Sequence, residues 1–368
     1  MLAGLRMSQR CNTLADIFLE DDMSQDPAAL TAQSGLLDAD TPQTVRLTVT
    51  EAHAVAALAL RRLSYSDEEI AIIADQLIDN ALCGYKFAGL PRILMIARNA
   101  KTAAPRQPVR VVHETAASAL IDGGNNVGYL TAVRGADMAI EKSRSCGLAA
   151  VGVYNSYYSG RLAYFVERMA LAGLIAIHTE SSGVLKVLPP GATRPALGTN
   201  PICIGFPSAD GPVVFDMGTA SMQGGDVVLH ALLGELLPAG IGYDAAGQPS
   251  RDPSAVIDGG VSPFGAHKGY GLSFCVQALG LLAGAALARG EVRDYGYFFF
   301  GIRPDILMQR GEFEQQMAQF VREIKATPRQ PGVDEIRIPF ERAVRERARR
   351  RQEGIVIERS VLDALGNL

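Results

Sequence analysis

The run Gly265–Leu272 (GAHKGYGL) places glycines, a histidine and a lysine directly before a long apolar segment. The apolar segment predicts a helix, so the run would form the start of that helix. Backbone amides exposed at a helix start, together with the ammonium group of Lys268, suit an anionic group such as a pyrophosphate. A flexible turn before a buried helix is the alternative, and these residues alone leave both interpretations open.

Asp122–Gly128 (DGGNNVG) is a second glycine-rich stretch. No strand followed by GxGxxG and a helix occurs here or elsewhere in the sequence, so a Rossmann dinucleotide fold has no support. Taken alone, this stretch predicts a turn, and contact with a ligand is the alternative.

The elements that must position these residues begin at Val45. Thr48–Glu51 and Ser66–Glu69 each have the spacing of a capping box, in which two side chains satisfy backbone amides at a helix start. The first pattern predicts a helix that runs to Leu63. The second predicts a helix whose apolar residues keep helical spacing until Gly84 ends it.

Helices and strands then alternate. The pattern predicts a helix over 131–146 that Gly147 ends, and another over about 161–172 that Gly173 ends. The predicted strands are Leu148–Tyr154, Leu174–His178, Ile202–Phe206 and Val213–Met217. The last two strands follow each other closely, which argues for a mixed α/β architecture and against a purely parallel, doubly wound sheet.

Composition excludes several classes of function. The 368 residues carry a net charge of −4 and no tryptophan, and no stripe of aromatic and basic residues suggests stacking on bases, so we expect no nucleic-acid partner. The five cysteines lack CxxC or Cys/His zinc-ligand spacing, so we expect reduced thiols and no metal site. The N-terminus lacks a continuous apolar stretch, which predicts a cytoplasmic protein. The length predicts two closely packed domains.

Three segments admit two interpretations each. Residues 1–44 are polar and uneven, which predicts a flexible extension or a start codon assigned too early. Tyr270–Ala288 approaches the ~20 apolar residues that span a membrane, but its Gln277 and its many Gly and Ala residues favour a buried helix at a domain or subunit interface. The basic segment Glu341–Arg351 could contact nucleic acid or a membrane, but its i,i+4 pairs of Glu and Arg favour a solvated, salt-bridged helix.

Several of these stretches together resemble one family. Gly191–Pro207 (GATRPALGTNPICIGFP) and Gly265–Leu272, in this order, resemble the fingerprint of the type-2 malate/L-lactate dehydrogenases. The shorter matches are Asp122–Gly128, Asn155-Ser156 with Gly160, Asp216-Met217 and Asp252-Pro253, so the resemblance extends from about Val45 to the C-terminus. Members are nicotinamide-dependent enzymes without a Rossmann domain. They act on 2-oxo and 2-hydroxy acids, ureidoglycolate, sulfolactate, diketogulonate and cyclic ketimine acids.

The resemblance implies a non-Rossmann α/β fold with a mixed, largely antiparallel sheet flanked by helices. It implies a helical domain for substrate binding and dimerisation over 45–120 and 290–368, and a dinucleotide-binding domain over 121–289. It also implies NAD or NADP as cofactor, a small carboxylate substrate and a homodimer.

The resemblance assigns roles to individual residues. Arg92 would hold the substrate carboxylate, with Thr179 beside the substrate. The residues assigned to the cofactor are Val214, Phe215, Asp216, Met217, Gly218, His267, Lys268, Gly269 and Glu341. Lys268 is the first choice for a phosphate contact.

Two catalytic side chains of the family are absent. Where the family has Gly-x-x-Ser-His-Gly-x-x-Arg, this chain reads Gly84–Arg92 (GYKFAGLPR), with Phe87 and Ala88 at the Ser and His positions. In the family, that histidine protonates the substrate as hydride arrives, and neither Phe87 nor Ala88 can donate a proton. Tyr158 replaces a second family histidine.

Two further positions depart from the family pattern. Glu180 stands where Asn is usual and adds a carboxylate near the expected nicotinamide pocket. Phe340 stands where Gly is usual, in the segment Pro339–Glu341.

Hydride transfer to a C=O group needs a proton donor, which typically contributes about 10²–10⁴ in rate. Tyr158, Lys86 and His178 are the candidate replacement donors, and ordinary packing explains each equally well. Asp216 occupies the family's relay position without the histidine that it would orient. It is therefore either a catalytic carboxylate or a cofactor or structural contact.

Three interpretations of function follow. The first is an NAD(P)-dependent oxidoreductase with a rebuilt acid–base site, which the retained Arg92 and Lys268 favour. The second is an inactive descendant that still binds a dinucleotide, and the third is a non-redox enzyme on the same scaffold. For the first, the missing donors predict a preference for imino acids over 2-oxo acids, because an iminium group arrives already protonated.

Overall fold

The computed structural model describes residues 43–184, 186–285, 287–288, 291–292 and 295–368. Nearly all of the predicted extension 1–44 therefore lies outside the described residues. The first strand, β1 (Thr44–Leu47), begins one residue before the predicted start of the organised chain.

Both predicted capping boxes are confirmed. Helix α4 (Val49–Arg62) follows Thr48, whose side chain accepts from the backbone N–H of Glu51. Helix α5 (Asp67–Leu82) follows Ser66, whose backbone N–H donates to the Glu69 carboxylate. These reciprocal bonds satisfy amides that have no partner within the helix, so both helices begin where the sequence predicts.

Seven strands form the central sheet, in the order β2-β3-β4-β13-β5-β6-β7. The strands are β2 (Arg110–Glu114), β3 (Ser118–Val127), β4 (Leu148–Tyr157), β5 (Ile175–Ser181), β6 (Ile202–Phe206), β7 (Val213–Met217) and β13 (Gly296–Ile302). Only the β3–β4 pair is parallel within this sheet, and every other pair is antiparallel. The mixed, largely antiparallel fold class is therefore confirmed.

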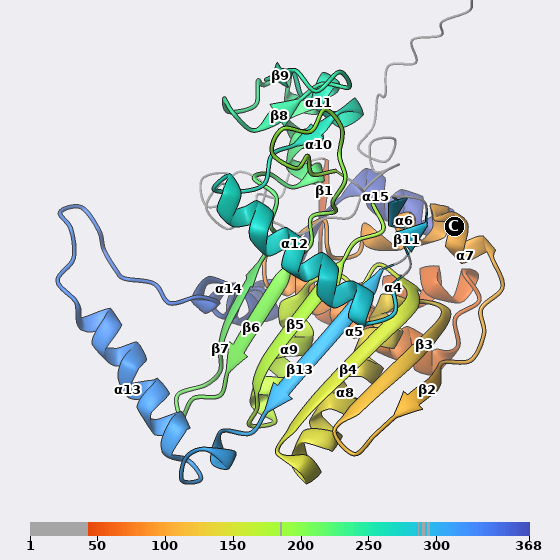
Figure 1. Cartoon of the computed structure of the whole chain (residues 1–368). Coiled ribbons are helices and arrows are strands. Elements are labelled where there is room, and N and C mark those ends of the chain that lie inside the picture. Colours follow the sequence, from red (N-terminus) through yellow and green to blue (C-terminus); the bar gives the residue numbers. More distant parts are fainter. Residues whose placement is uncertain (1–42, 185, 286, 289–290, 293–294) are drawn as a thin grey trace, which may run out of the picture.

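Helices cover both faces of the sheet (Figure 1). α8 (Gly128–Cys146) and α9 (Leu162–Leu171) pack on one face, and α12 (His267–Leu282) crosses the other over β5 and β13. Gly147 and Gly173 both follow these helices with φ of 84°, as predicted for residues that end a helix. Asp122–Gly128, predicted as a turn, instead completes β3 and begins α8.

Helix α12 differs from the buried helix predicted over 270–288. It is shorter, and it buries one face only, because Phe274 and Leu282 are 62% and 68% exposed. Ser273, Val276 and Gly280 lie on the face toward the sheet. Within the described residues, no helix is both long enough and apolar enough to cross a membrane.

The remaining elements surround the sheet (Figure 1). They are α6 (Arg92–Arg98), α7 (Ala100–Ala103), α10 (Gly224–Leu233), β8 (Gly242–Tyr243), β9 (Pro249–Ser250), α11 (Pro253–Asp258), β10 (Gly260–Val261), β11 (Leu287–Ala288), β12 (Glu291–Val292), the 3-10 helix η1 (Pro304–Ile306), α13 (Glu312–Ala326), α14 (Glu341–Glu353), β14 (Ile355–Glu358) and α15 (Arg359–Gly366). β14 pairs antiparallel with β1, so the two ends of the described chain lie together.

Helix α14 is salt-bridged, as predicted. The pairs Glu341–Arg345 and Glu346–Arg350 are formed, at 3.8 and 2.9 Å. The helix is not solvated on every side, because Arg350 is only 3% exposed and the helix packs against α5. The sequence pattern did not predict this buried face, because the face includes Arg350 and arginine side chains are usually exposed.

Two hydrophobic clusters form the core. The larger one combines α4–α6, α8, α9, the sheet and the elements at the C-terminal end. The smaller one lies beneath α10 and α11 and includes Val187, Leu237 and Val256. The larger cluster contains residues from both predicted domains, so it does not separate one domain from the other. The domain boundaries therefore stay a prediction.

Candidate functional site

The loop Gly84–Pro91 connects α5 to α6 and carries the two replaced positions. Gly84 has φ of 93°, a conformation that favours glycine, and it turns the chain out of α5. Asn80 then fixes the loop, because its side-chain N–H donates to the Ala88 carbonyl at 3.1 Å. Ala88 is 4% exposed, so a buried methyl group occupies the histidine position of the family pattern.

Arg92 and Tyr158 are brought together. Arg92 is the first residue of α6 and is 1% exposed, with its guanidinium carbon 5.4 Å from the centre of the Tyr158 ring. Tyr158 follows β4 with φ of 51°, and its ring makes edge contacts with Tyr157 and Tyr295. The face of an aromatic ring attracts a cation, so Tyr158 helps to hold the buried guanidinium group of Arg92 in place.

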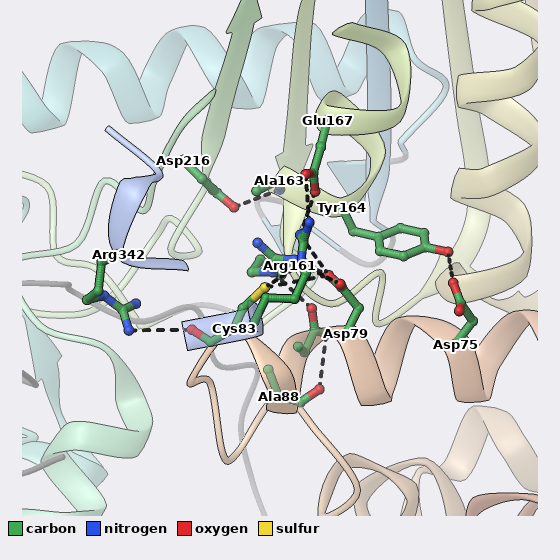
Figure 2. A network of polar contacts seen from close by, with 12 residues as sticks. Asp75, Asp79, Cys83, Ala88, Arg161, Ala163, Tyr164, Glu167, Asp216 and Arg342 are labelled. Carbon is green, nitrogen blue, oxygen red and sulfur yellow. Dashed lines mark hydrogen bonds and ion pairs between the residues drawn. The ribbon is translucent and has the colours of Figure 1, made fainter. Parts of the chain in front are cut away.

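Asp216 lies near the end of β7 and points toward the start of α9 (Figure 2). Its carboxylate accepts the backbone N–H of Ala163 at 2.8 Å and so acts as a helix cap supplied by another element. Burial raises the pKa of Asp216 to about 6, while this N–H and the charge of Arg161 oppose that rise. A carboxyl with a pKa near neutrality can exchange a proton under physiological conditions.

A buried cluster of charges lies beside Asp216. Arg161 donates to Asp79 at 2.5 Å and to Asn80 at 2.9 Å. Arg347 pairs with Asp79 at 2.9 Å and with Glu167 at 2.6 Å, so Asp79 serves two arginines. Arg161 and Asp79 meet within this network in Figure 2.

Aromatic rings border the same cluster. The Phe340 ring centre lies 5.6 Å from the guanidinium carbons of both Arg161 and Arg347. Tyr85 contacts Arg161 and Arg342 in the same manner, at 5.3 and 5.0 Å. The sequence prediction missed Arg161, Arg347 and Tyr85, because no motif marks them and their partners lie far away along the chain.

His178 and Lys86 are two of the three candidate replacement donors, and they lie in different surroundings. His178 is completely buried and stacks on Phe299 at 3.9 Å, with its Nδ1 3.1 Å from the Phe298 carbonyl. Burial lowers the pKa of His178 to about 3, so the ring is neutral at neutral pH and lacks the acidic proton of an imidazolium. Lys86 lines a small pocket against α14 and β14, with Arg350 and Glu358 among its neighbours.

Thr179 and Glu180 are adjacent in β5 and are both buried, so their side chains point to opposite faces of the sheet. The Ser159 hydroxyl donates to the Glu180 carboxylate. Glu180 lies on the same face as His178, toward α9, where it forms part of the polar core.

The structure brings together two of the segments assigned to a dinucleotide. The backbone N–H of Phe264 donates to the Thr219 carbonyl at 3.0 Å, which joins the residues after β7 to those before α12. Val214 is buried while Phe215 is 43% exposed. His267 and Lys268 are exposed at the start of α12, and Gly269 packs so closely on Phe264 that a side chain would not fit.

Glu341 lies at the start of α14, which begins after Phe340 with φ of 77°. Its carboxylate accepts from the backbone N–H of Ile338 at 3.1 Å and pairs with Lys325. These two contacts hold the Glu341 carboxylate in place.

A sequence profile described as malate/L-lactate dehydrogenase matches residues 47–366. The chain belongs to this family. It is 31% identical to the L-sulfolactate dehydrogenase of Methanothermobacter thermautotrophicus, over 83% of this chain and 91% of that protein.

Other members of the malate/L-lactate dehydrogenase family are similar over most of the chain. The delta(1)-pyrroline-2-carboxylate/delta(1)-piperideine-2-carboxylate reductase of Pseudomonas putida is 36% identical over 67% of this chain and 73% of that protein. The crystal structure of delta1-piperideine-2-carboxylate reductase from Pseudomonas syringae superimposes with a TM-score of 0.76 at 30% identity, covering 88% of this chain and 99% of that one. These relatives are dehydrogenases and reductases, which supports an oxidoreductase activity here.

Among the residues that the structure describes, no group of three or more His, Cys, Asp or Glu side chains is arranged to hold a metal ion.

We expect Asp216→Asn to change how stability depends on pH. The folded-state pKa of Asp216 is about 6, above its ordinary value of 3.8, so the folded chain takes up this proton at a higher pH than the unfolded chain. As the pH falls from about 7 to about 5, this carboxyl therefore raises the free energy of unfolding of the unmodified protein, and the variant lacks that contribution. Urea unfolding at both pH values measures the free energy of unfolding of each protein. An equal change in this free energy between the two pH values in both proteins would contradict the raised pKa of Asp216.

Proposed function

We propose that this chain is an NAD(P)-dependent oxidoreductase that transfers hydride to or from a small carboxylate-bearing 2-oxo/2-hydroxy or imino/amino acid. The observation that carries the proposal is the hydrogen bond between Phe264 and Thr219. It joins the segment after β7, the strand of Asp216, to the segment before α12 with its exposed start, on the scaffold of a malate/L-lactate dehydrogenase. The named relatives act on sulfolactate and on cyclic imino carboxylates, which supports this class of substrate.

The start of α12 fits an anionic dinucleotide. The helix has 16 residues, and its first two, His267 and Lys268, are exposed, so the Lys268 ammonium group can reach an anionic ligand at the helix start. Ala266 precedes them with φ of 51°, a left-handed conformation that costs a non-glycine residue about 1–3 kcal/mol and is typical of ligand-binding segments. In this proposal Val214–Gly218, His267–Gly269 and Glu341 hold NAD or NADP, which supplies or accepts a hydride when bound.

The substrate carboxylate is assigned to Arg92. A guanidinium group can pair with a carboxylate through two parallel hydrogen bonds, and Arg92 lies at the start of α6 beside the altered loop. Tyr158 lies against Arg92, so its ring would shape the same pocket. Thr179 has a buried hydroxyl without a hydrogen-bond partner among the described residues, which a substrate group could satisfy.

Proton transfer is the altered part of the site. Ala88 stands where the family has its proton-donating histidine and cannot donate a proton, and the neutral ring of His178 does not replace it. Asp216 is the remaining carboxyl with a pKa near neutrality, and Tyr158 and Lys86 stay proposed donors. The site therefore suits a substrate that needs little help with protonation.

A catalytically inactive dinucleotide-binding protein is the second candidate. The Phe340 ring, where the family pattern has Gly, fills space between Arg161 and Arg347 and favours this alternative. Binding of NAD(P)H without hydride exchange over a broad panel of oxo and imino acids would support it over the oxidoreductase.

Lys268→Ala should weaken NAD(P)H binding by about 1.5–3 kcal/mol, the usual range for a hydrogen bond to a charged group. The reason is the loss of an ammonium group beside the proposed pyrophosphate contact. A fluorescence titration measures the change, with Lys142→Ala on α8 as the control, since that lysine pairs with Glu114 at 2.8 Å. Unchanged affinity in Lys268→Ala would refute the assignment.

We expect a cyclic imino acid to be reduced with a higher kcat/KM than the matching oxo acids. An iminium carbon accepts hydride to give a neutral amine, whereas a carbonyl oxygen must also gain a proton. The comparison is Δ1-piperideine-2-carboxylate against pyruvate and 2-oxoglutarate with NADH and NADPH. Ala88→His should raise the oxo-acid rate relative to the imino-acid rate. Higher activity on the oxo acids in the unmodified protein would overturn the preference.

We propose a homodimer that uses the exposed face of α12. Phe274, Leu281 and Leu282 on this helix are 62%, 40% and 68% exposed, and apolar side chains grouped in this way mark an interaction surface. Light scattering at micromolar concentration should give twice the chain mass, and Leu282→Glu should lower it. Leu171→Glu on α9, at a site 69% exposed, is the matched control. A monomeric mass for the unmodified protein would count against the dimer.

A further inference from the structure

Tyr85 lies in the altered loop, three residues before Ala88. The end of α5 holds its backbone, because its N–H donates to the Asn80 carbonyl at 2.9 Å. The same Asn80 also holds the Ala88 carbonyl and Arg161. Tyr85 therefore occupies a fixed place between the loop and the buried charges.

Two guanidinium groups lie over the Tyr85 ring. The carbon of Arg161 is 5.3 Å from the ring centre and that of Arg342 is 5.0 Å. Positive charges close to a phenol stabilise the phenolate that remains after proton donation. Burial nevertheless raises the pKa of Tyr85, so the hydroxyl keeps its proton at neutral pH until a stronger base forms beside it.

Arg161 connects Tyr85 to Asp216. The negative charge of Asp216 raises the pKa of the Tyr85 hydroxyl. The positive charge of Arg161 lowers the pKa of Asp216, so the three groups lie close together. Arg161 is 7% exposed, and its Nη1 atom is buried without a hydrogen-bond partner among the described residues. A negatively charged oxygen arriving at this point would satisfy that atom.

Tyr85 also lies close to two of the segments that are proposed to hold the cofactor. The Asp216 charge acts on its hydroxyl, and Arg342, which follows Glu341 in α14, lies over its ring. A substrate placed against a dinucleotide held by these segments would therefore approach the Tyr85 side of the loop. Lys86, the next residue, instead lines the pocket against β14.

We propose that Tyr85 is the proton donor for reduction of 2-oxo acids in this chain, in place of the family histidine at position 88. The inference rests on the proposed oxidoreductase function. As the substrate carbon gains a hydride from reduced NAD(P)H, the C=O π pair moves onto oxygen, the Tyr85 O–H bond breaks and the new alcohol O–H bond forms. The Tyr85 phenolate, stabilised by Arg161 and Arg342, then regains a proton from solvent, with Asp216 positioned as the intermediate carrier.

The same arrangement predicts that Tyr85 is dispensable for imino acids. Hydride addition to a protonated imine gives a neutral amine, so no O–H bond needs to break. The two substrate classes therefore differ in their dependence on one hydroxyl group. A merely structural tyrosine would affect both classes alike.

The test compares Tyr85→Phe with the unmodified protein on pyruvate and on Δ1-piperideine-2-carboxylate. Tyr164→Phe is the matched control, because the Tyr164 hydroxyl donates to Asp75 at 2.5 Å on the side of the network away from Arg161 (Figure 2). Tyr158→Phe tests the competing donor. NAD(P)H affinity, measured by fluorescence, monitors the integrity of each variant.

For Tyr85→Phe, kcat on pyruvate should fall about 10²–10⁴-fold, while kcat on the imino acid should stay within about threefold. Equal losses on both substrates, or a selective loss in Tyr158→Phe instead, would overturn the assignment of Tyr85. Reduction of the imino acid but not of pyruvate by the unmodified protein would also overturn it, while leaving the oxidoreductase function in place. NAD(P)H binding without reduction of either substrate would mean that the oxidoreductase proposal itself has failed.

Discussion

The carboxylate of Asp79 accepts from two arginines that belong to different helices, Arg161 at the start of α9 and Arg347 in α14. Arg347 is paired in turn with Glu167. Each charge in this buried set has a partner, as it must, because one uncompensated buried charge costs several kcal/mol. The network therefore fixes three elements relative to one another: the end of α5 from which the altered loop departs, the start of α9 that Asp216 caps, and the start of α14 with Phe340.

The polar groups of the site have been redistributed around this network. The centre of the loop holds the methyl group of Ala88, and the polar side chains lie at its edges. On one edge Arg92 contacts Tyr158, and on the other Tyr85 contacts Arg161. Both tyrosines meet a guanidinium group, so each edge combines a fixed positive charge with a hydroxyl-bearing ring. The chain keeps the scaffold of the family, and the proposed proton donor lies at an edge of the loop and not at its centre.

Local patterns made much of the fold predictable. The Thr48 and Ser66 capping boxes depend on residues three positions apart, and the strands Ile202–Phe206 and Val213–Met217 depend on short apolar runs, so the sequence contains all the information needed. The largely antiparallel sheet and the connection of Asp216 with Lys268 required the family resemblance, because no local rule pairs strands that lie far apart.

The charge network could not be predicted in the same way. The Arg161–Asp79 and Arg347–Asp79 contacts join residues 82 and 268 positions apart. Arginine in a polar helix predicts exposure, so the burial of Arg350 in α14 contradicts the average behaviour of its residue type. Likewise, the position of His178 in β5 predicts a buried side chain, but the complete burial that lowers its pKa depends on packing against distant residues such as Phe299. Local patterns in the sequence therefore predicted helices and strands, whereas the state of the buried side chains depends on contacts between residues that lie far apart along the chain.

The pairing of β1 with β14 has a consequence for how the protein is made. Thr44 lies opposite Glu358 and Leu47 opposite Ile355, so the first strand of the described chain completes its ladder with one of the last. During synthesis from the N-terminus, the backbone groups of β1 that pair with β14 have no strand partner until most of the chain has been translated. Arg347 reaches Asp79 equally late. Contacts of such long sequence separation close a very large loop, which makes them slow to form. The altered loop therefore acquires its final surroundings only after the C-terminal helices have left the ribosome, so the site is assembled in the last stage of folding.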